Sequence, residues 1–491
     1  MKRASGLLRA VPRPLAALLL AVAFIGVSWA LINPAWQAPD EDVHFSYVQT
    51  LAERHRLPGT QGSSLSGAQF TAMQFTNTDP VVFFPFARPE WTEVAWDRYR
   101  RTSAGAGAAD GGGPNPASGY PPAFYLAGVV GYKLAGSHDV HARLYATRLV
   151  SVLWLLVTTV GAWLLAGELF GRRRELQLVS AACVGLWPML DFISSSVNPD
   201  ALMYATWSVS LWLGVRILRR GLTVGQGLAF GAVVGIALIT KAPSLALLPA
   251  AAFVAVWSIV RLMLERRYKR ALVALAVALL AFAIPVEAWR LTVAAQDRLA
   301  YGQAAGVTAG LNLPEFLSYL WQFYLPKLPS QTRLTFDSQY VSTYPALNVW
   351  VATGWAAFGW VTVYFPLAVY KLFFAITSVV VAAATGKGLV LLWRRRRSRS
   401  ALAAALPVAI FIALAAGALV LGLHIAEYRV RGPTNQGRYL FPLASLGGAG
   451  VALALTLVPV RARSLAIGAV LGGLVVYQLF CLGLMATHYY A

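Results

Sequence analysis

The sequence predicts an all-α polytopic membrane protein. Of its 491 residues, 58% are hydrophobic and only 12% are charged. Its mean hydropathy is +0.59. Apolar runs recur from one end to the other, and many approach the roughly 20 residues that a helix needs to cross about 30 Å of hydrocarbon. This combination excludes an ordinary soluble globular protein.

Charge and cysteine content narrow the class further. The net charge of +21 alone would fit a nucleic-acid partner, but the Lys and Arg residues cluster at the ends of apolar runs. That arrangement is typical of membrane topology, so we expect no nucleic-acid partner. Cys183 and Cys481 both lie inside apolar runs, which indicates neither a disulfide framework nor a cysteine metal site.

We expect about eleven membrane spans from the apolar runs. They are residues 14–32, 143–168, 176–193, 200–218, 224–240, 243–262, 271–290, 363–392, 401–423, 438–459 and 464–486. Basic residues before the first run keep the N-terminus in the cytoplasm. A cleaved signal peptide has a similar pattern. We expect a retained anchor because the run is long and no small-x-small cleavage site precedes Pro34.

Threading these spans alternately places every basic cluster on the cytoplasmic side. The clusters are 172–174, Arg219 with Arg220, 265–270, 394–399, and Arg461 with Arg463. A miscounted span would place the later basic clusters on the exoplasmic side. Because all of the clusters fall on the cytoplasmic side, they support this assignment of the spans. The expected organisation is an N-terminal anchor (1–33), a first exoplasmic loop (34–142), a transmembrane core (143–290), a second exoplasmic segment (291–362) and C-terminal helices (363–491).

The first exoplasmic loop combines three kinds of segment. Residues 43–51 have the apolar pattern of a helix lying beside the membrane. Residues 103–119, rich in Gly and Ala, have no apolar pattern, and we expect a flexible tether or lid there. Residues 120–136 are apolar but short and begin with a proline pair, which predicts a juxtamembrane or re-entrant helix rather than a full crossing.

An acidic cluster follows the first span directly. Asp40, Glu41 and Asp42 stand beside His44 in "PDEDVHF". In one interpretation Asp40 caps a helix and the other acids favour the positive end of its dipole. In the other, a carboxylate at the membrane surface acts as a general base or a cation ligand, with Glu41 and His44 neighbours on one helix face. Spacing alone does not decide between them.

The order of motifs resembles that of a known superfamily. The motifs are "PDEDVHF", "YPPAFYL", "ARLYATRLVSVLW", "ELFGRRRELQ", "SSSVNPDALMYATW", "ITKAPSLALLP" and "NQGRYLFP", spread over residues 33 to 442. This order resembles the GT-C polytopic glycosyltransferases. "DE-VHF" is similar to protein O-mannosyltransferases, and "YPPAFYL", "LFGRRR" and "TKAPSLALLP" are similar to lipid A aminoarabinose transferases. The nearest resemblance is to the bacterial domain-of-unknown-function family 2142.

The resemblance implies a GT-C-like bundle that transfers a sugar, with inversion, from a polyprenyl-phosphate donor to an exoplasmic glycan or lipid at the bacterial plasma membrane. Asp40 best matches the general base of the first loop, with Glu41 and His44 as its supports. Asp42 is an additional acid that departs from the simple pattern of the related transferases. It is therefore left open which carboxylate acts, and whether Mg²⁺ or Mn²⁺ bridges Asp40, Glu41 and Asp42.

Basic residues on the exoplasmic side are candidates for the donor phosphate. They are Arg438, Lys241, Arg431 and Arg429, since an arginine fork bonds two phosphate oxygens. Anchoring helix ends in lipid headgroups is the alternative for Arg429 and Arg431. Arg438 stands at the start of a span, where a buried charge is costly and usually functional.

Weaker candidates for substrate binding are Tyr120, Pro122, Asn198, Asp200, Gln436 and Tyr439. Helix capping alone would explain Asp200. The histidines have no ligand spacing that predicts a zinc site. A transporter or flippase of lipid-linked sugars is the competing class, and a non-catalytic assembly subunit a third. Transporters tend to carry internal repeats and midplane sites, whereas here no repeat is found and polar residues gather at one membrane face.

Overall fold

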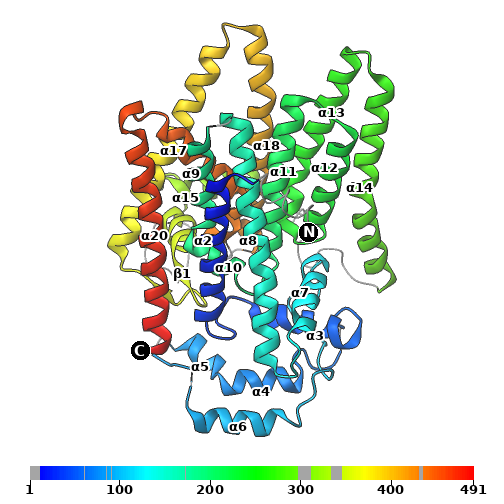
Figure 1. Ribbon diagram of the computed structural model, residues 1–491, viewed down its shortest axis with the longest axis vertical. Coiled ribbons are helices and arrows are strands. Elements are labelled where there is room, and N and C mark those ends of the chain that lie inside the picture. The colour runs from blue at the N-terminus through cyan, green and yellow to red at the C-terminus, as the bar shows by residue number, and fades with distance from the viewer. Residues whose placement is uncertain are drawn as a thin grey trace.

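The structure is a computed structural model that describes residues 11–59, 61–84, 86–89, 91–171, 173–296, 311–332, 345–430 and 435–491. It is almost entirely helical, and its long helices run along one common direction (Figure 1). The elements are α2 (Arg13–Ile32), α3 (Glu41–Arg54), α4 (Gly67–Phe75), α5 (Thr78–Phe83), α6 (Glu93–Ser103), α7 (Ala123–Leu134), α8 (Val140–Phe170), α9 (Arg174–Gly185), α10 (Pro188–Ser194), α11 (Asp200–Arg220), α12 (Val224–Leu238), η1 (Ala242–Leu247), α13 (Leu248–Leu264), α14 (Tyr268–Ala295), α15 (Leu313–Tyr324), η3 (Leu347–Ala352), α16 (Thr353–Trp355), β1 (Ala357–Phe358), β2 (Val363–Tyr364), α17 (Leu367–Arg395), α18 (Arg399–Val430), η4 (Gly437–Leu443), α19 (Ala444–Leu455) and α20 (Val460–Tyr490).

The chain is a polytopic membrane protein. Within the described residues, 9 helical segments are long and apolar enough to cross a membrane. They are α2, α8, α11, η1 with α13, α14, α17, α18, η4 with α19, and α20. Each coincides with one of the expected spans. The two other expected spans have a different form.

The expected span 176–193 is broken. α9 and α10 meet at an angle of 59°, and Pro188 stands at the first position of α10. Proline lacks the backbone N–H that would continue the hydrogen bonding of α9, so the break has a local cause. The expected span 224–240 forms α12, which has only 15 residues and is short for a crossing. The count rises to ten only if α9 and α10 together form one bent span.

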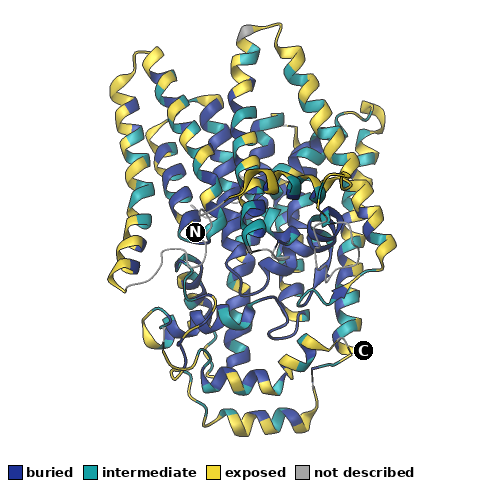
Figure 2. Ribbon diagram, turned by 180° about the vertical axis from the view of Figure 1, so that it is seen from behind, coloured by how far each residue is buried: buried dark blue, intermediate teal, exposed yellow. Residues whose placement is uncertain are grey.

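The central helices are α8 and α11. They pack against each other, and α8 also contacts α2, α7 and α9. Figure 2 shows buried residues concentrated in this middle, whereas the protruding α13–α14 and α17–α18 hairpins expose much of their surface. Exposed apolar side chains such as Leu280 on α14 and Val379 on α17 are suited to contact with lipid tails.

Short helices cover one end of the bundle. α3 to α7 all belong to the first long loop, and α4, α5 and α6 lie at the extreme end opposite the hairpins (Figure 1). α7, with 12 residues, packs on α3 and α8. It matches the short juxtamembrane or re-entrant helix expected for residues 120–136.

The Gly-rich segment 103–119 makes backbone contacts with the loop that follows α3. It has no strand and no helix beyond the end of α6, but backbone hydrogen bonds join Gly59 to Gly112 and Gly113 to Ser63. A Cβ atom at Gly113 would overlap the carbonyl group of Gly62, so glycine permits the close approach. Backbone packing thus takes the place of side-chain packing at these glycines, and the flexible tether or lid stays a prediction.

Candidate active site at the end of α2

Asp40 occupies a turn between α2 and α3 with its side chain directed away from the helix. Its φ is +61°, in the left-handed region, which costs about 1 kcal/mol or more for a residue with a Cβ. Although Asp40 is the N-cap residue of α3, its side chain makes no capping hydrogen bond. Its carboxylate is half-exposed, and Oδ2 lies 3.5 Å from Nη2 of Arg438. The capping interpretation of this residue was therefore wrong.

Arg438 is held at the beginning of η4 and is only 2% exposed. Its carbonyl oxygen accepts a hydrogen bond of 3.0 Å from the Tyr204 hydroxyl. Gly437 donates its backbone N–H to the Thr353 hydroxyl at 2.5 Å, and a Cβ there would overlap the backbone of Gly354. Tight backbone packing thus fixes the direction in which the Arg438 side chain extends from the backbone.

The Arg438 guanidinium has unused donors. Nη2 contacts Asp40 and, at 3.4 Å, the hydroxyl of Tyr439. Nε and Nη1 are buried and have no hydrogen-bond partner among the described residues. Buried donors without partners are costly, and each of these two atoms shares one edge of the guanidinium with Nη2, the arrangement that can bond two oxygens of one phosphate group. The arrangement is thus suited to an anionic ligand.

Lys241 and Asp200 form a second ion pair in the same place. Lys241 Nζ donates to Asp200 Oδ1 at 2.6 Å, and the ammonium lies 5.9 Å and 5.4 Å from the ring centres of Tyr120 and Tyr439. Asp200 Oδ2 is buried without a hydrogen-bond partner in the described part of the chain. The cluster therefore contains two cations and two carboxylates, contributed by four separate segments of the sequence.

His44 borders this cluster as a neutral side chain. Burial, followed by the nearby Lys241 ammonium, lowers the pKa of His44 to about 3. Its Nδ1 atom lies 3.0 Å from the hydroxyl of Tyr125, and its ring faces Tyr120 at 6.0 Å between centres. Glu41 and His44 both lie on α3 three residues apart, as expected, but their side chains hydrogen-bond to different partners, Arg148 and Tyr125.

Glu41, expected to support catalysis, is held in a buried ion pair, and its expected catalytic role stays a prediction. Its side chain is fully buried against that of Arg148, with an Nε to Oε1 distance of 2.8 Å. The backbone N–H groups of Trp36 and Val197 also donate to its carboxylate, at 3.1 Å and 3.0 Å. Arg148 in turn donates to carbonyl groups at the end of α2. Both carboxylate oxygens are thus occupied, and the pair joins the turn holding Asp40 to α8.

Asp42 lines a separate pocket of about 270 Å³ together with Asn77, Thr78 and Asp79. Burial raises the pKa of Asp42 to about 6, and its Oδ1 atom has no hydrogen-bond partner among the described residues. The carboxylates of Asp40, Glu41 and Asp42 therefore face different surroundings. They do not fit a shared Mg²⁺ or Mn²⁺, and in the described part of the chain no group of three or more His, Cys, Asp or Glu could hold a metal ion.

The remaining candidates for substrate binding lie at the starts of three different helices. Asn198 accepts from the Asp200 N–H at 3.0 Å and donates to the Pro39 carbonyl at 3.4 Å, so it links the start of α11 to the Asp40 turn. Pro122 stands at the start of α7. Gln436 precedes η4, and its Oε1 is buried without a hydrogen-bond partner among the described residues.

The two other basic candidates stay predictions. Arg429 lies in the last turn of α18 and is half-buried. Arg431 lies outside the described residues.

Sequence reasoning missed Arg148, Tyr125 and Tyr204. Arg148 lies within an apolar run, and an ionisable residue inside a span is a recognised signal of function or structure. That signal would have identified Arg148. The two tyrosines had no such signal, because aromatic residues are common throughout membrane helices.

Residues 23–446 match the model of a family described as predicted membrane protein (DUF2142). No curated protein matches the sequence. Among solved structures, ArnT from Cupriavidus metallidurans bound to undecaprenyl phosphate is 15% identical, with a TM-score of 0.49, and the match covers 96% of this chain and 77% of that chain. The oligosaccharyltransferase AglB from Archaeoglobus fulgidus, in complex with an inhibitory peptide and a dolichol-phosphate, is 11% identical with a TM-score of 0.46. That match covers 97% of this chain but only 56% of AglB, so the chain spans little more than half of AglB's length.

Proposed function

This chain belongs to the DUF2142 family of predicted membrane proteins, and we propose that it is an inverting membrane glycosyltransferase. The donor is a sugar linked to polyprenyl phosphate, and the acceptor is a hydroxyl group of an exoplasmic glycan or lipid. The site faces the exoplasmic side of a bacterial plasma membrane, because the positive-inside rule assigns the basic clusters at the other end to the cytoplasm.

One observation carries the proposal. A half-exposed carboxylate, Asp40, lies 3.5 Å from a buried guanidinium, Arg438, whose Nε and Nη1 atoms lack partners among the described residues. A proton acceptor beside cationic donors suited to an anion supports the proposal. Asp40 also follows α2 by only a few residues, so both groups stand near the depth at which a lipid-linked phosphate would lie.

Asp40 is the general base of the reaction. It takes the proton from the acceptor hydroxyl as that oxygen attacks the anomeric carbon of the donor sugar. The bond between the anomeric carbon and the phosphate oxygen breaks, and its electron pair leaves with polyprenyl phosphate. The attack comes from the face opposite the phosphate, so the configuration inverts. A positioned base typically contributes about 10²- to 10⁴-fold in rate.

Arg438 holds the phosphate and stabilises the charge that develops on it. Its unpartnered Nε and Nη1 atoms can each donate to a phosphate oxygen, and either of them shares an edge of the guanidinium with Nη2, which lies 3.5 Å from Asp40. No acid is needed on the leaving side, because a phosphate ester is already a good leaving group and requires positive charge to hold it.

Lys241 adds a second cation whose charge is balanced by Asp200 in the unliganded protein. Tyr120 and Tyr439 enclose its ammonium and provide faces on which a sugar ring can pack. The carboxylates diverge, as described above, so no metal ion enters this reaction scheme.

The distinction between a transferase and a flippase can be tested in cells from which the gene is deleted. We expect mass spectrometry of membrane extracts to show an accumulated lipid-linked sugar. In spheroplasts of these cells, a membrane-impermeant oxidant such as periodate should destroy it, because an unused donor waits on the outer face. Protection from external periodate would support a flippase instead. Unchanged lipid-linked sugars in the deletion strain would contradict both functions.

A further inference from the structure

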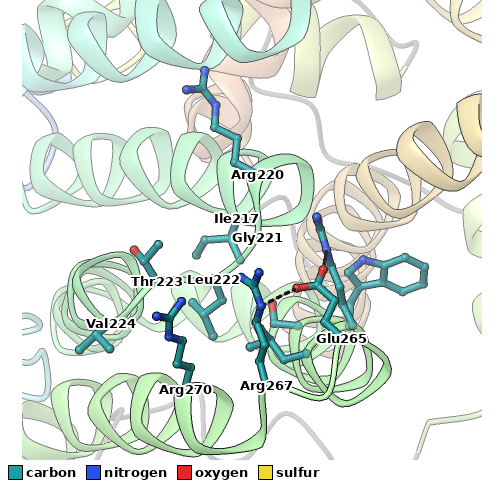
Figure 3. A pocket seen from close by; sticks show the side chains of 13 residues that line it. Ile217, Arg220, Gly221, Leu222, Thr223, Val224, Glu265, Arg267 and Arg270 are labelled. Atoms are coloured by element: carbon teal, nitrogen blue, oxygen red, sulfur yellow. Dashed lines mark hydrogen bonds and ion pairs between the residues drawn. The ribbon is translucent and has the colours of Figure 1, made fainter.

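A second pocket lies at the opposite end of α11 from Asp200. α11 is 21 residues long, which corresponds to about 30 Å at the helical rise of 1.5 Å per residue. Asp200 at its beginning belongs to the candidate active site, and Arg220 at its end lines a pocket of about 800 Å³. The pocket lies between the α11–α12 and α13–α14 connections (Figure 3). The two sites thus stand at opposite membrane faces.

The lining of this pocket has an excess of positive charge. It contains Arg220, Arg261, Arg267 and Arg270, with Glu265 as its one acidic member. Arg261 and Arg267 share Glu265, at N to O distances of 3.1 Å and 3.8 Å. Arg220 points away from the others in Figure 3 and pairs with Glu168 outside the pocket.

Arg267 and Arg270 provide the charge that is available to a ligand. Arg270 has no hydrogen-bond or ion-pair partner in the described part of the chain. Arg267 has only its longer contact with the shared Glu265. Both extend from the connection between α13 and α14 towards the Leu222 loop (Figure 3). Two guanidinium groups directed into one pocket can bind a phosphate from two sides.

The rest of the lining is apolar. Ile217, Leu222, Trp257 and Leu262 contribute to it. Exposed apolar side chains on α13 and α14 continue outward from the same end, namely Val256, Val260, Leu264 and Leu272. A free phosphate ion would use only the arginines, whereas a phospholipid would use the arginines through its headgroup and the apolar surface through its acyl chains.

We propose that this pocket binds the phosphate group of an anionic phospholipid from the leaflet opposite the active site. Basic pockets between membrane helices at the cytoplasmic face have the chemistry that such headgroups require. The bound lipid fills the space between two helix hairpins whose far ends, at Asp200 and Lys241, form part of the candidate active site. The proposal concerns a separate site and does not depend on sugar transfer.

The test uses full-length purified protein, delipidated in detergent, and native mass spectrometry with phosphatidylglycerol or phosphatidylcholine as the probe. We expect phosphatidylglycerol to be retained in preference to phosphatidylcholine. In the Arg267→Gln/Arg270→Gln variant its affinity should fall roughly tenfold or more. The matched control is Arg396→Gln/Arg397→Gln, which removes the same charge from the α17–α18 connection. This control should bind as the wild type does.

Each other outcome overturns the proposal. Equal losses in both double variants would show general attraction to a basic surface. Binding of inorganic phosphate, but not of phosphatidylglycerol, would show a phosphate site that does not take lipid. Unchanged phosphatidylglycerol binding in the pocket variant would place the lipid elsewhere. Thermal unfolding of each variant without lipid shows whether a loss of binding reflects a lost site or a lost fold. If Arg267→Gln/Arg270→Gln does not fold, the variant Arg267→Lys/Arg270→Lys replaces it. This variant keeps both charges and should retain most of the binding.

Discussion

Nη2 of Arg438 lies 3.5 Å from Oδ2 of Asp40, although the two residues stand near opposite ends of the sequence. The contact joins the turn after α2 to the start of η4. It brings together the two residues whose types best fit a general base and a phosphate ligand. The proposed chemistry depends on this contact.

Arg438→Gln should weaken binding of undecaprenyl phosphate, used as the probe, by roughly tenfold or more, because a charge-assisted, two-pronged contact is lost. Arg438→Lys should recover only part of the affinity, since an ammonium lacks the planar fork. Arg290→Gln is the control, because Arg290 is exposed and its one ion pair within the described residues is with Glu287 on α14. Wild-type affinity in Arg438→Gln would remove Arg438 from the phosphate site.

Glu41→Gln should destabilise the protein rather than only inactivate it. The substitution leaves the buried Arg148 guanidinium without its counter-charge, and breaking a buried pair costs about 3 to 5 kcal/mol. The thermal unfolding midpoint of purified protein measures this effect, and Glu53→Gln, in a partly exposed pair with Arg143, should cause a smaller decrease. A folded, stable Glu41→Gln protein without activity would instead support a catalytic role for Glu41.

Asp42 should make the stability of the protein depend on pH. Its pKa rises from 3.8 to about 6 on folding because of burial, so the protonated form favours the folded state. This contribution is fully present below about pH 4 and is lost as pH rises through 6. Asp42→Asn should therefore raise the free energy of unfolding at pH 7 by roughly 2 to 3 kcal/mol.

Unfolding midpoints at pH 4, 5, 6 and 7 measure this effect. Asp97→Asn is the control, because Asp97 is exposed on α6 and Arg100 is its one ion-pair partner in the part of the chain that the structure describes. Its pH profile should follow that of the wild type, whereas the profile of Asp42→Asn should be flatter. Parallel profiles for Asp42→Asn and the wild type would show that Asp42 does not titrate in this range.

The Asp200–Lys241 pair should behave as a coupled unit. Asp200→Asn alone leaves a buried ammonium without its carboxylate, at a cost of about 3 to 5 kcal/mol. The double variant Asp200→Asn/Lys241→Met should unfold at a temperature closer to that of the wild type, while it binds undecaprenyl phosphate more weakly. Wild-type affinity in a stable double variant would limit the pair to a structural role.

The sequence identified several of the residues that meet at the candidate site. Asp40, Lys241, Asp200, Tyr120 and Arg438 were all singled out because polar residues at the ends of apolar runs are informative in a membrane protein. Once these runs form a bundle, their ends converge. Nine of the expected spans were also recovered by the structure, because long apolar runs permit few alternatives.

Pairwise contacts could not be predicted in the same way. The spacing of Glu41 and His44 suggested a shared role, but Glu41 pairs with Arg148 on α8, which only the tertiary packing brings close. The same holds for the capping role of Asp40, since a left-handed backbone at φ +61° turns its side chain towards η4. The broken span at Pro188 was missed because hydropathy measures length and polarity but not direction.

The most direct test of the account is donor consumption by Asp40→Asn. Membrane vesicles from the deletion strain carry the accumulated lipid-linked sugar, and purified protein is reconstituted into them. Mass spectrometry then follows the loss of that lipid. We predict that Asp40→Asn consumes it about 10² to 10⁴ times more slowly than the wild type while it binds undecaprenyl phosphate with comparable affinity. Consumption at the wild-type rate by a folded Asp40→Asn protein would contradict the assignment of Asp40 as the base.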